Sequence, residues 1–515
     1  MRDINILLEP FNFISIIDCK ISKHLNDHSV MNFVCRISSD QENIIMNTDI
    51  KNTFIKLKVI DEDNKSIILF SGIIKSFSLK KSVDTRILHL NCISSTYLMD
   101  IIKKTRIFQN TSSTYSDILN YISVNNGYEF ITNIDDTNIG KLIVQYNETD
   151  FEFIKRLASH FNTCISPSYL TDGIKYFFGL PESSKNFNLE YDYVIKKEII
   201  EDLRKDAEKL PFSIEQGATI IKMISRNIYE IGDYTIFNGQ KYIVSNIYTN
   251  YIGNELKHTY ILKEKLGQYI SKYYNTSIIG SSLSAKIDGV SSDKVRVCVM
   301  TEGIQNSKSW LPYSTVYSSP DGTGWYCMPE IGDSVRIYFP TEKEHHGYII
   351  SAVHVSNNDC NSNITKINQS NYTTLNQSKS NYESEAPRSN PDYKSFKSKH
   401  GKEMLFTPNS ILFTNNNGMK VEILDDEGIS IISDKKVNII SEEEINIEST
   451  TGSIKLMGQK SVLLEKLKSQ PAVQSVGSEQ SAESEQSAES EPSNTKLELS
   501  ADDNILLYGA KIKMQ

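Results

Sequence analysis

We predict a mainly β protein with an α+β region at its N-terminus, a small closed β-barrel after it, and a C-terminal intertwined triple-stranded β-helix made by a homotrimer. Three observations support this fold class. Short strand-like runs dominate residues 1–265, five or six more fill residues 281–355, and paired aliphatic residues recur every eight positions after residue 400. The predicted domains follow in that order along the chain.

The composition of the 515-residue chain, 39% hydrophobic and 23% charged, is that of an ordinary folded protein with several domains. No apolar run is long enough to cross a membrane as a helix, so we expect no transmembrane helix. The N-terminus lacks the apolar core of a signal peptide, so we expect no secretory signal. The formal net charge of -9 disfavours nucleic acid as a partner. Seven scattered cysteines without a C-x-x-C pair favour a reducing cytoplasm over a disulfide framework or zinc ribbon.

Residues 1–265 are predicted to combine short strands with a few helices. The runs 52–60, 65–74 and 86–93 alternate or are rich in β-branched residues, and strand patterns return over 220–262. This N-terminal region is therefore expected to be dominated by strands.

Two helices in this region are predicted from capping boxes, in which Thr114 precedes Asp117 and Thr149 precedes Glu152. Apolar residues follow each box at helical spacing: Tyr115, Ile118, Leu119 and Ile122 in the first helix, and Ile154, Leu157, Ala158 and Phe161 in the second. A third, more charged helix is predicted over 196–209.

Residues 281–355 are predicted to form the small closed barrel, because short alternating runs are separated by turn signals. Val295, Val297 and Val299 occupy alternate positions, so one face of their strand should be buried. Residues 356–395 are rich in Asn and Ser, show no period, and are predicted to be a linker.

Residues 396–464 carry pairs of alternating aliphatic residues that start at positions 421, 429, 437, 445 and 454. The pattern stops at a low-complexity insert over 465–495, predicted to be disordered, and returns in terminal strands at 496–515. The predicted core and trimer-interface residues are Val421, Ile423, Ile429, Ile431, Val437, Ile439, Ile445, Ile447, Ile454, Leu456, Leu497, Leu499, Ile505 and Leu507.

This octad repeat favours several chains over one. A spacing of two places both aliphatic side chains of a pair on one strand face, and a lone chain would leave its strand edges open. Eight residues are few for a coil in which a single chain surrounds its own core, whereas three chains close a tube with one strand each per layer. A single-chain β-roll is the alternative, although the Gly-Gly-x-Gly-x-Asp units of its calcium-binding form are absent.

Three motifs, taken in order with the octads, resemble one family. VQYNETDFEFIKRL (144–157) is similar to its strand and capped helix, IGDYTIFNGQKYIV (231–244) to later strands of its hub, and WYCMPEIGDSVRIYF (325–339) to its oligosaccharide-binding-type (OB) barrel. The chain thus resembles VgrG-type spike proteins of contractile injection systems: type VI secretion systems, contractile phage tails and bacteriocins. The octads resemble the family's β-helical needle.

The resemblance implies a structural spike that is not an enzyme, needs no cofactor, and has neither a catalytic nor a metal site. The implied hub (1–265) docks on the tail tube and baseplate, a PAAR-type protein or effectors join the needle, and the trimer contacts the target membrane on injection. The protein would assemble in the cytoplasm, join the apparatus, and be delivered outside the cell or into the target. A cell-wall polysaccharide hydrolase and a trimeric adhesive fibre are the alternative functions.

Three further patterns have a functional and a structural interpretation. Glu344-His345-His346 could hold a metal, but adjacent histidines on a strand point apart and no third ligand is evident. We expect a surface turn there, because the segment lies where a hairpin turn is predicted. We expect Cys298 and Cys327 to be buried free thiols. Trp310 and Trp325 could form a sugar-binding face on the barrel, but packing in the core or between chains is the favoured interpretation.

Overall fold

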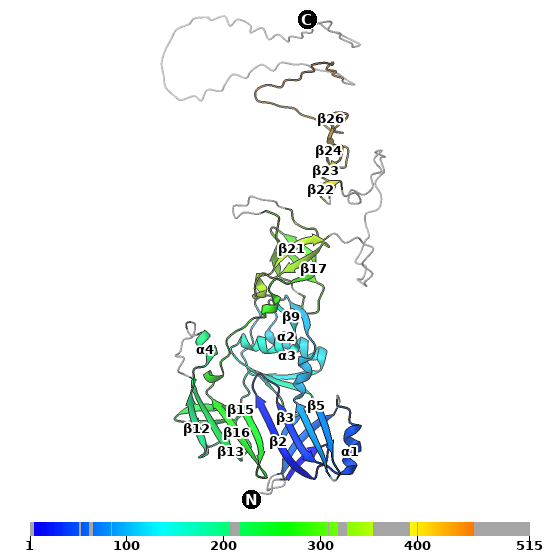
Figure 1. The fold of residues 1–515 in the computed structure, drawn as a ribbon. Helices are drawn as coiled ribbons and strands as arrows, with labels where there is room; N and C mark the ends of the chain where they lie inside the picture. Colours follow the sequence, from blue (N-terminus) through cyan, green and yellow to red (C-terminus); the bar gives the residue numbers. More distant parts are fainter. Residues whose placement is uncertain are drawn as a thin grey trace, which may run out of the picture. The chain divides into compact units, whose positions relative to one another are not determined.

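The computed structural model describes residues 5–50, 53–60, 65–83, 85–206, 208, 217–306, 308–317, 327–353, 392–398 and 400–457. The chain divides into two compact units, Met1–Thr365 and Lys366–Gln515, and each is described by itself (Figure 1). The predicted linker, apart from 392–395, and all of the predicted insert and terminal strands lie outside the described residues. None of the helices in the described ranges has the length and hydropathy needed to span a membrane.

An eleven-stranded antiparallel sheet forms one layer of the first unit. Its strands are β1 (Asn5–Glu9), β2 (Ser15–His24), β3 (Val30–Arg36), β4 (Phe54–Ile60), β5 (Ser66–Lys81), β6 (Arg86–Ile93), β12 (Tyr193–Lys197), β13 (Thr219–Ser225), β14 (Tyr234–Phe237), β15 (Gln240–Ile252) and β16 (Glu255–Lys263). The spatial order is β1-β4-β5-β6-β3-β2-β15-β16-β13-β12, with β14 on β15. The pairing of β2 with β15 joins strands from the two ends of this region, and helix α1 (Ser39–Met46) connects β3 to β4.

Most of the predicted strands in this region are confirmed. β4, β5 and β6 occupy the three expected runs, although β5 continues to Lys81, and the expected turn at Asn238-Gly239 joins β14 to β15. Both turn residues have positive φ, 50° and 76°, as a two-residue hairpin turn requires.

The predicted helix over 196–209 is wrong in its first half. Residues up to Lys197 belong to β12, in which Ile195 pairs with Ile221 of β13, and the helix α4 spans Glu201–Lys205 alone. The β-branched Val194 and Ile195 extend the sheet, and this pairing outweighs the local helical pattern.

A second layer of the first unit contains both capped helices. Its elements are η1 (Ser95–Asp100), β7 (Lys104–Phe108), α2 (Tyr115–Asn126), β8 (Tyr128–Thr132), β9 (Ile143–Glu148), α3 (Asp150–Ser159), β10 (Ile165–Pro167) and β11 (Ile174–Phe178). Both capping boxes are confirmed: Thr114 Oγ1 accepts from Asp117 N at 3.2 Å, and Thr149 Oγ1 from Glu152 N at 3.1 Å. The predicted apolar stripes pack together in one core.

The predicted barrel is confirmed as a closed five-stranded sheet. After η3 (Leu266–Gln268) and η4 (Thr276–Ile278), its elements are β17 (Ser282–Ser291), β18 (Lys294–Val299), β19 (Trp310–Pro312), β20 (Ser334–Tyr338), η5 (Glu344–His346) and β21 (Tyr348–Val353). The order is β19-β18-β17-β20-β21, and a bridge between Tyr313 and Ile349 joins the two edges. Val295, Val297 and Val299 all point into its core.

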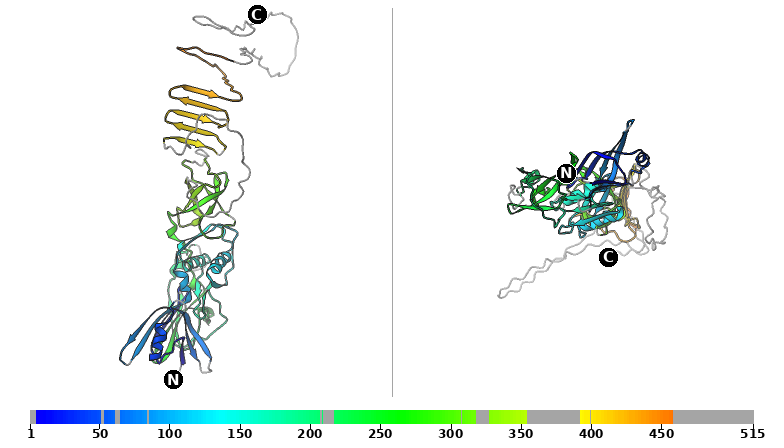
Figure 2. Two further views of the ribbon diagram at one scale, coloured as in Figure 1. Left: turned by 90° about the vertical axis from the view of Figure 1, so that its right-hand side faces the viewer. Right: turned by 90° about the horizontal axis from the view of Figure 1, so that it is seen from below.

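The strands in the described part of the second unit form an antiparallel meander, seen as stacked arrows in Figure 2. Its strands are β22 (Lys394–Lys397), β23 (Glu403–Thr407), β24 (Ser410–Thr414), β25 (Lys420–Leu424) and β26 (Gly428–Ile432). Each strand pairs with the next along the chain. The octad period therefore corresponds here to a five-residue strand followed by a short turn.

Candidate functional site

One face of the meander consists almost entirely of apolar side chains, and we call it the shaft face. Strand register aligns its residues in two columns across the sheet. The first column contains Phe406, Ile411, Ile423 and Ile429; the second contains Phe396, Met404, Phe413, Val421 and Ile431. Because strand side chains alternate between faces, all nine residues lie on the same side.

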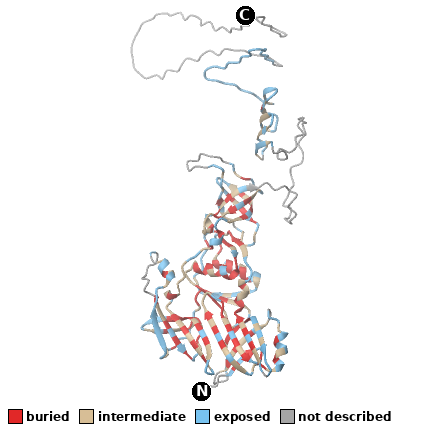
Figure 3. Cartoon of the chain, viewed as in Figure 1, coloured by how far each residue is buried: buried red, intermediate tan, exposed pale blue. Residues whose placement is uncertain are grey.

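The shaft face is open in the single chain. Val421 and Ile423 are 38% and 39% exposed, and Ile429 reaches 72%. In the described part of this unit, the single buried residue is Glu422, on the opposite face, and Figure 3 shows no red elsewhere in it. Such a contiguous apolar surface on a folded chain marks an interaction site.

The octads continue beyond the meander without forming strands. Residues 433–457 are described, contain no strand, and are exposed throughout, apart from the half-buried Ser433. Six predicted core residues lie there, each about half exposed or more: Val437, Ile439, Ile445, Ile447, Ile454 and Leu456. Four others lie on the shaft face, whereas Leu497, Leu499, Ile505 and Leu507 lie outside the described residues. The single chain thus covers none of the ten that are described.

The opposite face of the meander is mixed. Leu405 pairs with Leu412 at its centre, flanked by Lys397–Glu403 and Lys420–Glu422 ion pairs with N···O distances of 3.1 and 2.5 Å. This contrast makes the shaft face, rather than the opposite one, the candidate for the predicted trimer interface.

A buried ion-pair network joins helix α3 to the barrel. Arg156, which is 0% exposed, donates to both carboxylate oxygens of Glu148, at 2.8 and 2.7 Å, and to Glu344 of η5 at 2.7 Å. It also donates to the carbonyl of Val144 at 2.8 Å. Bidentate pairing satisfies the guanidinium, whose burial would otherwise be costly. No pattern in the sequence distinguished this arginine from exposed ones.

A second network lies at the start of the same helix. Asp150 accepts from Arg106 at 2.6 Å and from Lys104 at 2.8 Å, and Arg106 also pairs with Glu302 of the barrel at 3.4 Å. Burial alone would raise the pKa of Asp150, but the hydrogen bonds from Lys104 and Gln145 and the charge of Arg106 outweigh it and lower this pKa. These groups hold the barrel and its neighbouring layer together and are not arranged as an acid–base pair facing a cleft.

The expectation of a surface turn at Glu344-His345-His346 is only partly correct. The segment is a 3-10 turn, and His346 is exposed, but Glu344 is 4% exposed and binds Arg156. Within the described ranges, no group of three or more His, Cys, Asp or Glu side chains is placed to hold a metal.

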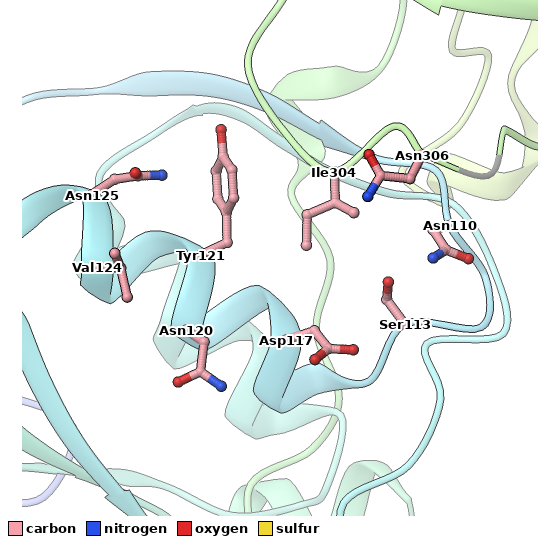
Figure 4. A pocket seen from close by; sticks show the side chains of 9 residues that line it. All are labelled: Asn110, Ser113, Asp117, Asn120, Tyr121, Val124, Asn125, Ile304 and Asn306. Atoms are coloured by element: carbon pink, nitrogen blue, oxygen red, sulfur yellow. The ribbon is translucent and has the colours of Figure 1, made fainter.

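A pocket of about 550 Å³ lies where α2 meets a loop of the barrel (Figure 4). It is lined by Asn110, Ser113, Asp117, Asn120, Tyr121, Val124, Asn125, Ile304 and Asn306. Asp117 is engaged in the helix cap, and the hydroxyl of Tyr121 accepts from Gly303 N at 3.1 Å. With its one carboxylate engaged in this way, the pocket lacks paired carboxylates for hydrolysis.

Two expectations from the sequence concern side chains of the barrel, one for its cysteines and one for its tryptophans. The prediction that Cys298 and Cys327 are buried is wrong, because both are exposed. Cys298 lies on β18 between the inward-facing Val297 and Val299, so strand alternation turns it outward. Trp310 is 43% exposed in the single chain, and Trp325 lies outside the described residues.

The barrel matches a known domain family. Residues 288–354 fit the family described as the type VI secretion system/phage-baseplate injector OB domain. This match confirms the predicted resemblance to VgrG-type spike proteins over the barrel. No curated protein sequence matches the chain.

Solved structures of related architecture include a Francisella PdpA–VgrG complex, with 11% identity, a TM-score of 0.50, and coverage of 83% of this chain and 87% of that one. The E. coli c3393 protein is a type VI secretion component similar to the T4 tail proteins gp27 and gp5. It shares 11% identity with this chain at a TM-score of 0.46, and the match covers 67% of this chain and 99% of c3393. A 43 kDa prophage tail protein from Shewanella oneidensis has 10% identity and a TM-score of 0.37, covering 52% and 99%. At such identities the Francisella likeness concerns the fold alone.

Proposed function

We propose that this chain is the structural spike subunit of a contractile injection apparatus and that it works as a homotrimer without enzymatic activity. The injector OB domain at residues 288–354 supports its place in such an apparatus. The observation that carries the trimer is the set of ten described octad residues, all exposed in the single chain.

The trimer is favoured by burial energetics. Burying one aliphatic side chain contributes about 1.5–3 kcal/mol, so the octads of three chains supply a large driving force when they cover one another. Three wrapped chains also satisfy the backbone of residues 433–457, which form no strand alone. A tube closed in this way resists unfolding, which suits a part that is driven mechanically through an envelope.

The remaining roles follow from this proposal. The N-terminal region (1–265) would dock on the tail tube and baseplate, and the needle would carry a PAAR-type tip protein or effectors to the target membrane. Assembly would begin in the cytoplasm and delivery would end outside the cell. The polysaccharide hydrolase and the adhesive fibre receive no support from the injector domain match.

The solution mass tests this proposal. By light scattering, we expect the full-length chain to have three times its mass of 58.5 kDa, and a form truncated before Ser395 to lose or weaken this association. A full-length monomer at micromolar concentration would contradict the trimer and favour a single-chain β-roll.

A further inference from the structure

One face of the eleven-stranded sheet carries a continuous row of polar side chains, which we call the amide row. Each of its residues lies opposite the next one on the neighbouring strand. Residues beside the row in sequence, such as Ile21 and Phe33, point into the core on the other face, because strand side chains alternate. Across β16, β15, β2, β3, β6 and β5 (Figure 1), the row consists of Lys257, Asn250, Lys20, Asn32, Asn91 and Ser76.

The three asparagines of the row have no evident structural role in the sheet. Asparagine is depleted in strands, because its amide competes with the backbone for hydrogen bonds. Among the described residues, the amides of Asn32 and Asn250 have no hydrogen-bond partner, and Asn91 Oδ1 is buried without one. A buried acceptor without a partner costs about 1–3 kcal/mol. A bound molecule with hydrogen-bonding groups of its own would satisfy these amides.

The charge around the row is positive. Lys20 pairs with Asp18 at 3.0 Å, and Glu255 at the end of β16 pairs with a neighbouring arginine at 2.9 Å. For Lys257 in the row and Arg36 on the same face of β3, the described residues include no carboxylate within ion-pair distance. On these six strands, the cations without a carboxylate partner therefore have no counterpart among the described acids of this face, and the row favours an anionic partner.

We propose that the amide row binds an extended acidic polypeptide. A side-chain amide carries the same donor and acceptor groups as a peptide bond, so Asn250, Asn32 and Asn91 pair with the backbone of the bound chain. Lys257 and Arg36 bind its carboxylates. Because neighbouring strands lie about 4.8 Å apart, the row spans about 24 Å, the length of about seven residues of extended chain. This inference goes beyond the spike function.

The shortage of aromatic rings favours a polypeptide over a nucleic acid. Single strands of nucleic acid are held by several rings that stack on successive bases. Among the described residues of these six strands, Tyr248 is the one exposed Phe, Tyr or Trp. Its ring packs edge to face on His24, with ring centroids 5.0 Å apart. A polypeptide backbone needs no stacking, because amides recognise it through hydrogen bonds.

The test is fluorescence anisotropy of the full-length protein at low salt with three labelled dodecapeptides that alternate Ser with Glu, Gln or Lys. We expect the Glu peptide to bind most tightly and the Lys peptide most weakly. Replacing Asn32 and Asn250 together by Thr should weaken binding of the Glu peptide about fivefold or more, because two hydrogen-bonding amides are lost. Lys257→Gln should weaken it about threefold through the loss of one exposed charge contact.

Two controls separate binding by the amides from a structural role. Threonine favours strands more than asparagine does, so the double Thr variant should be at least as stable as the unaltered chain in urea denaturation. Asn125→Ala removes an exposed asparagine of helix α2, outside the sheet, and should leave peptide binding unchanged.

Several results would overturn the proposal: no binding of the Glu peptide, equal binding of the Lys peptide, unchanged binding or lower stability in the double Thr variant, or an equal loss in Asn125→Ala. A changed solution mass of the double Thr variant would also overturn it, because the row would then contact a second copy of the chain. The mass of the unaltered chain tests the spike proposal separately, so a trimer that binds no peptide rejects this inference alone.

Discussion

Arg156 Nη1 donates a 2.7 Å hydrogen bond to Glu344 Oε1, and this contact joins helix α3 to the 3-10 turn of the barrel through a fully buried guanidinium. Because Arg156 also neutralises Glu148, its removal would leave two acids of low exposure without their cation.

We therefore predict that Arg156→Ala lowers the apparent free energy of unfolding by about 3–5 kcal/mol, as for other broken buried pairs. Urea denaturation followed by fluorescence measures this change. Arg204→Ala is the matched control, because Arg204 forms an exposed pair with Glu201 at 3.8 Å and should cost less than about 0.5 kcal/mol. Equal effects of the two substitutions would contradict the role of Arg156.

Gly303 is predicted to accept no side chain. Its φ is 136°, and an added Cβ would lie 1.8 Å from the carbonyl oxygen of Ile107, where the barrel loop lies against β7. We expect Gly303→Ala to destabilise the first unit by more than about 2 kcal/mol, since both backbone strain and a backbone clash oppose it.

Gly239→Ala provides the comparison for Gly303. Gly239 also has positive φ, 76°, but no atom lies within 4 Å of its added Cβ, so strain alone, about 1 kcal/mol, should remain. Thermal unfolding of both variants measures the difference, and Gly303→Ala should have the lower melting temperature. Similar melting temperatures would show that the loop containing Gly303 moves aside freely and that the clash contributes nothing.

Stability should fall on mild acidification. Burial lowers the pKa of His160 to about 3, with the charges of Lys272 and Arg156 adding to it, and burial with the charge of Lys23 lowers the pKa of His258 to about 4. Both stay neutral when folded but bind a proton when unfolded below about pH 6.5, so acid favours the unfolded state. For each histidine, the free energy of unfolding should fall by about 1.4 kcal/mol per pH unit between pH 6.5 and the pKa of that histidine in the folded protein.

Denaturation at pH 7 and pH 5 measures this dependence. In His160→Gln the free energy of unfolding should change less steeply with pH. The contribution of one histidine is removed, because glutamine does not titrate. Tyr115 Oη lies 2.9 Å from His160 Nδ1, so some stability is lost at both pH values, but the difference between them remains informative. An unchanged slope in the variant would contradict a neutral buried His160.

The octad residues are predicted to act between chains. Ile439→Asp and Ile447→Asp together should shift the full-length protein from trimer towards monomer, because each would place a charge inside the closed needle. Lys436→Asp is the control: it changes charge in the same exposed segment but falls between the aliphatic pairs. Light scattering measures both, and a trimer that persists in the double variant would contradict this interface.

Local patterns in the sequence predicted much of this structure. The capping boxes at Thr114 and Thr149 are present, Val295, Val297 and Val299 face inward, and the Asn238-Gly239 turn forms. These features depend on residues within a few positions of one another, where steric preferences and hydrogen bonds act without the rest of the chain. The octad spacing likewise determined which aliphatic residues share a face.

Other features depended on the tertiary structure. The burial of Arg156 against Glu344 and the strand at Lys196–Lys197 arise from contacts between distant segments. The periodicity, and therefore the set of side chains that lie together on one element, can be predicted from the amino-acid order. Which face of an element meets another element and which meets solvent depends on packing summed over residues far apart in the chain, so it becomes visible in the folded protein.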